Sequence, residues 1–160
     1  ASFIRVEGFV FAHVADEGLI ESGAADLLRY RRHIGAEHVR IFADVKKKHS
    51  AHAVTADVSL AETARAAEFF LADGVVVTGA ATGETTDPDE VEAVHRAVQL
   101  PVLVGSGVTA RNLSTYAAAD ALIVGSSVKQ DGQWENPIDP ARAAELVAAF
   151  SALQPGGSLR

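Results

Sequence analysis

Two turns rich in glycine and serine are the residues whose type and spacing most directly indicate chemistry. Gly105-Ser106-Gly107 follows one short apolar run, and Gly125-Ser126-Ser127 follows the next. Because glycine has no Cβ, backbone N–H groups in such turns can converge on an anion. One such turn would more simply be a tight connection, but two on consecutive strands favour a phosphate site. Its predicted members are Gly105, Ser106, Gly107, Gly125 and Ser126.

A second group of polar side chains lies near the ends of the first three predicted strands. Because side chains alternate in direction along a strand, Arg5 and Glu7 share one face of the first strand, and Asp44 has the same face of the second. Thr78 ends the third strand. Two neighbouring carboxylates can share a proton, hold a divalent cation or neutralise Arg5. A catalytic role for Asp44 and a structural pair with Arg5 both stay open.

Lysines and histidines follow Asp44 in the segment Lys46-Lys47-Lys48-His49-Ser50-Ala51-His52. A lysine there can stabilise developing negative charge, and a histidine can act as general acid or base. We therefore predict that the catalytic residues are Asp44, Lys48 and His49. Glu7 and Thr78 are predicted to orient the substrate.

The histidines also raise the question of a metal. Asp44, His49 and His52 could together hold one, but histidine pairs in polar loops are more often plain solvated residues. We predict neither a metal nor a cofactor. The remaining histidines (His13, His33, His38 and His95) are expected at loop, helix-end or helix-surface positions and are assigned no role.

Short apolar runs alternate with helical patterns, which is typical of parallel βα architecture. The predicted strands are Phe3–Val6 or a longer run reaching Phe11, then Val39–Ala43, Val75–Thr78, Val102–Val104 and Ala121–Val124. Nearly continuous apolar character predicts that all five are parallel and covered on both faces. At roughly 31 residues per unit of an eightfold barrel, the 160 residues hold about five units. The paired glycine turns favour such a partial (β/α)8 barrel over a doubly wound open sheet.

Apolar residues at helical spacing predict the helices between these strands. The first has Leu27, Tyr30, Arg31 and Ile34 on its inner face, and the second has Leu60, Ala64, Ala67 and Leu71. The third begins at Asp87-Pro88, an N-cap before a proline, and buries Val91, Val94 and Val98. A short helix follows Thr109, its predicted N-cap. The last begins at Asp139-Pro140 and buries Ala143, Leu146, Val147 and Phe150.

Composition is ordinary for a globular protein, with 48% hydrophobic and 22% charged residues. The net charge of −7 argues against nucleic acid as a partner and against docking on anionic lipid through a basic patch. Cysteine is absent, which excludes disulfides and thiolate metal sites. No apolar run reaches the ~20 residues of a membrane span. We predict one domain over residues 1–154, a flexible tail at 155–160 and a cytoplasmic location.

Several further motifs follow one another in order. They are Leu28–Ala36, Ile41–Val45 with Lys48-His49, Val77–Gly83, Pro101–Thr109, Ile123–Lys129 and Asn136–Pro140. Together they resemble the BtpA/SgcQ family over nearly the whole chain. The resemblance implies a (β/α)8 barrel of the ribulose-phosphate-binding type, of which this chain would supply the fourth to eighth units. Because the sequence also begins inside a strand pattern without methionine, we expect it to be a piece of a longer protein.

The sequence departs from the family at two places. Glu7 stands where the family tends to have asparagine, and Lys46-Lys47 replaces a less charged pair. Cyanobacterial members are associated with photosystem I biogenesis as extrinsic membrane-associated factors. Other bacterial members are linked to sugar metabolism, which implies an older enzymatic role without defining a reaction.

These observations lead to two expectations about function. The first is a barrel protein that binds a small phosphorylated metabolite at its carboxyl-terminal rim, whether or not it is an enzyme. The alternative is a non-catalytic photosystem I biogenesis or stability factor. Such a factor would need an apolar docking surface outside the rim. Trp134 is one candidate anchor for that surface, although the simpler role of this tryptophan is packing at the rim. Five units would also leave two open edge strands, through which copies of the chain could associate.

Overall fold

The computed structural model describes residues 1–46, 49–79 and 85–153. Three features of the sequence prediction lie outside these ranges: the catalytic candidate Lys48, motif residues 80–83 and the tail at 155–160.

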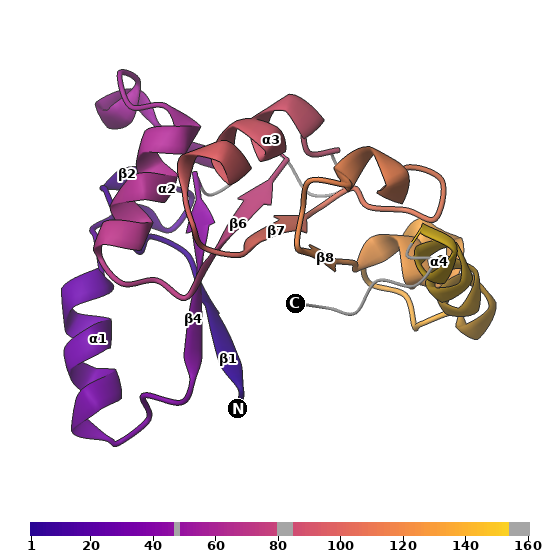
Figure 1. Cartoon of the computed structure of the whole chain (residues 1–160), viewed down its shortest axis with the longest axis horizontal. Coiled ribbons are helices and arrows are strands. Elements are labelled where there is room, and N and C mark those ends of the chain that lie inside the picture. Colours follow the sequence, from indigo (N-terminus) through magenta and orange to yellow (C-terminus); the bar gives the residue numbers. More distant parts are fainter. Residues whose placement is uncertain (47–48, 80–84, 154–160) are drawn as a thin grey trace.

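Five parallel strands form the main sheet, in the order β1-β4-β6-β7-β8. Their bounds are Phe3–Val6, Arg40–Val45, Gly74–Thr78, Val102–Gly105 and Ala121–Ile123. Every neighbouring pair is parallel, and the strands fan round in an arc from β1 to β8 (Figure 1). The predicted partial (β/α)8 barrel is confirmed, with β1 and β8 at the edges of the described sheet.

Helices connect successive strands and lie along one side of the sheet (Figure 1). The α-helices are α1 (Ala24–His33), α2 (Leu60–Phe69), α3 (Pro88–Ala97) and α4 (Pro140–Leu153). The 3-10 segments are η1 (Ala53–Thr55), η2 (Leu113–Tyr116), η3 (Ser126–Val128) and η4 (Gln130–Gly132). The predicted start of α3 is confirmed, since the Asp87 carboxylate accepts the Asp89 N–H and Pro88 opens the helix. The predicted short helix begins later, at Leu113 rather than directly after Thr109.

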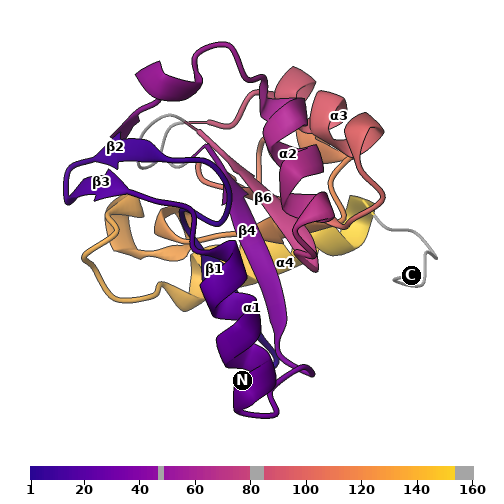
Figure 2. The same ribbon diagram turned by 90° about the vertical axis from the view of Figure 1, so that its left-hand side faces the viewer.

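A small antiparallel sheet, which the sequence did not predict, covers the carboxyl-terminal end of β1 and β4. Its strands are β2 (His13–Ala15), β3 (Gly18–Ile20) and β5 (Ser50–Ala51), in the order β3-β2-β5. The longer version of the first strand is therefore wrong. Gly8 turns the chain with a φ of +66°, and a Cβ there would lie 2.5 Å from Ile20 Cγ2. Figure 2 shows the resulting β2–β3 hairpin above α1, at the end of the molecule opposite the N-terminus.

The core lies between the outer face of the sheet and the helices. Outward residues of β4, β6 and β7 are buried there together with small and branched residues of the helices. They include Ile41, Ala43, Val45, Val75, Val77, Val102 and Val104 from the sheet, and Ala24, Ala64, Ala67, Val91 and Val94 from the helices. This burial confirms the predicted inner faces of α2 and α3, except at Leu71.

Several residues predicted to be buried are exposed. Leu71 lies past the end of α2 with a φ of +64°, which turns its side chain away from the core. Tyr30 and Ile34 are exposed, whereas α1 packs against the core through Leu27, as predicted, and through Leu28. Val147 and Phe150 of α4 are also exposed. They border an apolar cavity of about 320 Å³ between α4 and β8 that no described residue fills.

A buried chain of hydrogen bonds holds the end of β7. The Thr86 hydroxyl donates to the Gly105 carbonyl at 3.2 Å, and the Tyr116 hydroxyl donates to the Thr86 carbonyl at 2.9 Å. Both residues are buried, Tyr116 to 2% exposure. The segment before α3 and the η2 segment thus jointly determine where β7 ends and the following glycine–serine turn begins.

Replacing Tyr116 by phenylalanine should lower the free energy of unfolding by about 1–3 kcal/mol, because the buried Thr86 carbonyl would lose its donor. Urea denaturation measures this change. The chain has two tyrosines, and Tyr30→Phe is the matched control because Tyr30 is 61% exposed. Equal effects of the two substitutions would contradict the role of the hydrogen bond.

The same tyrosine should make stability depend on alkaline pH. Burial, and to a lesser degree the nearby Asp87, raise the pKa of Tyr116 above its ordinary value of 10.0. The unfolded chain releases this proton at lower pH than the folded chain, so the free energy of unfolding should fall as pH rises past about 10. Unfolding measured from about pH 8 to 11 should show a shallower decline in Tyr116→Phe than in Tyr30→Phe. Parallel declines in the two variants would count against the raised pKa.

Candidate functional site

The two glycine–serine turns line one cavity of about 370 Å³, which we call the inner cavity. Ser106 and Gly107 border it from the turn after β7, and Gly125 and Ser126 border it from the turn after β8. A Cβ added at Gly125 would meet no atom within 4 Å, so the backbone there faces open space. Four of the five predicted phosphate residues therefore lie together.

The fifth, Gly105, lies at the end of β7 behind the cavity. Its α-carbon faces the inner side of the sheet, where an added Cβ would lie 3.3 Å from Val76 Cγ1 and 3.5 Å from Thr78 Cγ2. A side chain at this position would pack tightly against the neighbouring strand, whether or not the Gly105 backbone contacts a ligand.

Hydrogen bonds hold the two turns in shape and join them to each other. Asn112 Nδ2 donates to the Gly107 carbonyl at 2.8 Å, and Ser127 Oγ donates to the Val108 carbonyl at 2.7 Å. Ser106 has a φ of +96°, a backbone conformation that residues with a Cβ rarely adopt. Strain of this kind persists only where the surroundings enforce it. The walls of the inner cavity are therefore preformed.

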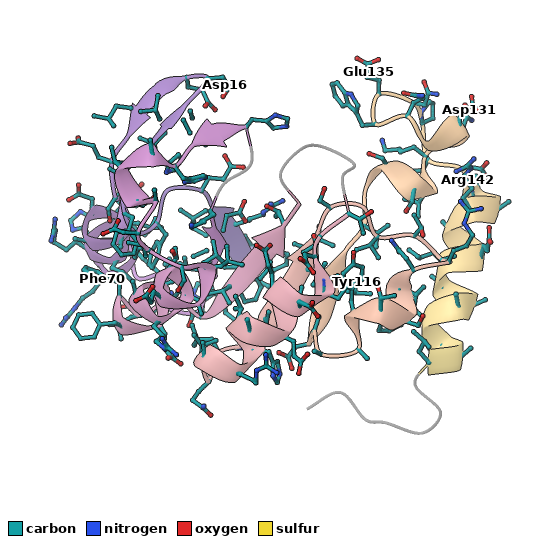
Figure 3. All side chains as sticks on the ribbon, turned by 90° about the horizontal axis from the view of Figure 1, so that it is seen from above. Asp16, Phe70, Tyr116, Asp131, Glu135 and Arg142 are labelled. Carbon is teal, nitrogen blue, oxygen red and sulfur yellow. The ribbon has the colours of Figure 1, made fainter. Side chains whose placement is uncertain are left out.

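Arg142 is a cation at the inner cavity that sequence reasoning missed. It comes from the first turn of α4, and Figure 3 shows it at the end of that helix near the labelled Asp131. Its guanidinium lies 3.4 Å from the Ser127 carbonyl and 3.8 Å from an Asp139 carboxylate oxygen, and its side chain is 43% exposed. The sequence could have indicated Arg142, because the first turn of a barrel helix lies near the carboxyl end of the strand before it.

Arg5 and Asp44 form the principal ion pair of the inner face. Arg5 Nε and Nη2 donate to the two Asp44 carboxylate oxygens at 2.7 and 2.8 Å. The Asp44 side chain is 1% exposed and that of Arg5 is 34% exposed. The hydrogen bonds to Asp44, together with the charges of Asp44 and Glu7, raise the pKa of Arg5 against the opposing effect of burial. The sequence left open a structural pair of Asp44 with Arg5 and a catalytic role for Asp44, and the structure contains the pair.

Asp44 also lines a second, much smaller cavity of about 20 Å³, which it shares with Lys46, His13 and His52. The register of β2 with β5 pairs Val14 with Ala51, so the next antiparallel pair is His13 and His52. Their ring centroids are 5.3 Å apart. His13 is buried, which corrects the expectation that it lies on a loop or a helix surface.

The remaining predicted site residues are distributed around these two cavities. Thr78 is opposite Gly105 in the sheet, and its buried hydroxyl has no hydrogen-bond partner among the described residues. Glu7 is exposed beyond the end of β1, close enough for its charge to act on Arg5. His49 is exposed and borders neither cavity. Trp134 is exposed rather than packed at the rim.

Within the described ranges, no group of three or more histidine, aspartate or glutamate side chains is arranged to hold a metal ion. The helices in the same part of the chain also lack the length and apolar character needed to cross a bilayer.

Comparison with known proteins identifies relatives of about twice this length. A mitochondrial protein of Caenorhabditis elegans is 47% identical over 152 residues, covering 95% of this chain and 55% of the relative. The photosystem I biogenesis protein BtpA of Synechocystis is 38% identical over 153 residues, covering 94% of this chain and 53% of the relative. The chain thus spans about half the length of the curated relatives it matches.

Among solved structures, a thiamine phosphate pyrophosphorylase from Pyrococcus furiosus is similar with a TM-score of 0.48 and 14% identity. This similarity covers 96% of this chain and 84% of that chain. The model of the BtpA family matches residues 1–152. With nearly every residue of the described fold inside that match, this chain belongs to the BtpA family.

Proposed function

We propose that the inner cavity binds the phosphate group of a small phosphorylated metabolite. The observation that supports this most directly is the meeting of Gly107, Gly125 and Ser126 with the Arg142 guanidinium around one preformed space. Glycine turns present N–H donors to an anion without obstruction, and arginine adds charge and a donor geometry that matches phosphate. The site as a whole is proposed for the complete protein, since this chain covers about half of its relatives.

We propose that the part of the ligand other than its phosphate group is bound between the inner cavity and Asp44. Arg5 lines that cavity and binds Asp44, so it can hold a polar group of the ligand against the buried carboxylate. The Thr78 hydroxyl on the neighbouring strand is available to orient a substrate oxygen. Asp44, Lys48 and His49 remain the proposed catalytic residues, with Glu7 beside Arg5. The cytoplasmic location also stays a prediction.

Binding of orthophosphate and of sugar phosphates, measured by isothermal titration calorimetry, tests the proposal. Gly125→Val should abolish this binding, because the added side chain projects into space that no protein atom occupies. Gly107→Val should do the same, although its φ of +65° will also strain the turn. Gly23→Ala, outside the cavity lining, is the control and should leave binding unchanged. Unchanged binding in Gly125→Val would overturn the proposal.

A second candidate function follows from the name of the Synechocystis relative, a photosystem I biogenesis protein. The observation that favours it is a run of exposed apolar residues at the end of α2 (Phe69, Phe70 and Leu71), away from the carboxyl-terminal rim. If the chain assists assembly through this surface, replacing Phe69 and Phe70 by serine should abolish binding to purified photosystem I. Phosphate binding should survive the same change. Retained photosystem binding would contradict a role for this surface.

We also propose that copies of the chain associate through β1 and β8, the edge strands of the described sheet. Edge strands present unpaired backbone donors and acceptors, which favour pairing with another chain. Light scattering on the purified chain should therefore show a species larger than a monomer, and a stable monomer would contradict this.

A further inference from the structure

A second polar cavity, of about 280 Å³, adjoins the inner cavity, and we call it the outer cavity. The two share Thr109, Ser127 and Arg142 as lining residues. Arg111, from the segment between β7 and η2, lines only the outer one. Two arginines thus line the outer cavity, and one of them also lines the inner one.

Among the described residues, neither arginine side chain has a tight partner. In the described part of the chain, no hydrogen bond or ion pair engages Arg111. With described residues, Arg142 makes the long side-chain contacts to Ser127 and Asp139. The Asp139 carboxylate is itself occupied as the cap of α4, where it accepts the Ala141 N–H at 2.9 Å. Both arginines therefore keep donors free for an anion.

We infer that the ligand carries two directly linked phosphoryl groups, as in a diphosphate ester or inorganic pyrophosphate. The first group would lie on the glycine–serine turns, and the second would lie between Arg142 and Arg111. Because Arg142 borders both cavities, it can bridge two phosphoryl groups that share an oxygen. The phosphates at opposite ends of a sugar bisphosphate are too far apart to share one guanidinium. This inference rests on the proposed phosphate site and names its class of ligand.

The charge balance favours a diphosphate over two separate anions. Glu145 lines the outer cavity and offsets one of its two positive charges. A free orthophosphate gains little there, whereas a phosphoryl group tethered to one already bound has a high effective concentration. Arginine also binds phosphate with paired N–H donors, so the added contact is directional.

Calorimetric titration of the full chain with orthophosphate and with inorganic pyrophosphate tests the inference. Pyrophosphate should bind about tenfold more tightly, which corresponds to one additional charge-assisted contact. Arg111→Gln should weaken pyrophosphate binding about tenfold and leave orthophosphate binding unchanged. Arg29→Gln is the matched control, since Arg29 lies on α1 and pairs with Asp26. It should alter neither titration.

Other outcomes separate this inference from the proposed function. If orthophosphate binds and pyrophosphate binds no more tightly, the two-phosphoryl ligand is excluded while the phosphate site stands. If Arg111→Gln weakens both ligands equally, the separate outer subsite is excluded. Tighter binding of fructose 1,6-bisphosphate than of pyrophosphate would also overturn the inference. If no phosphate compound binds, the proposed function fails as well.

Discussion

A carboxylate that is 1% exposed has to be paired, and in this fold Asp44 is paired by Arg5 through two hydrogen bonds. The pair joins the inner faces of β1 and β4, on the side of the sheet that the helices do not cover. It also stands between the two cavities, since Arg5 lines the inner cavity and Asp44 lines the small one with His13. The pair thereby links a residue that lines the inner cavity to one that lines the small cavity.

The inner cavity depends on a different set of contacts, which come from residues far apart in the chain. Thr86 and Tyr116 hold the end of β7 from two other segments. Ser127 then joins the turn after β8 to the turn after β7. These bonds keep Ser106 in its left-handed conformation and set the spacing between the two turns before any ligand arrives. A preformed anion site of this kind avoids the cost of ordering loops on binding.

The two faces of the sheet explain how stability and chemistry are separated. The outer face is apolar and packs against α1, α2 and α3, so it stabilises the fold without functional groups. The inner face carries Arg5, Asp44 and Thr78 in successive strands. Parallel strands bring their carboxyl ends to the same edge, which is why residues so far apart in sequence share one site.

The sequence by itself determined the five parallel strands, the alternation that places Asp44 beside Arg5, the start of α3 and the glycine turns, because each follows from local periodicity or turn chemistry. It could not determine the β2–β3–β5 sheet, because strands of two or three residues carry no periodic signal and β5 pairs with β2 from a distant part of the chain. It also misjudged α4, whose apolar stripe predicts burial that the described residues do not supply. Only tertiary structure decided that the Arg142 guanidinium contacts the Ser127 carbonyl and that His13 meets His52, since both contacts depend on how distant segments pack.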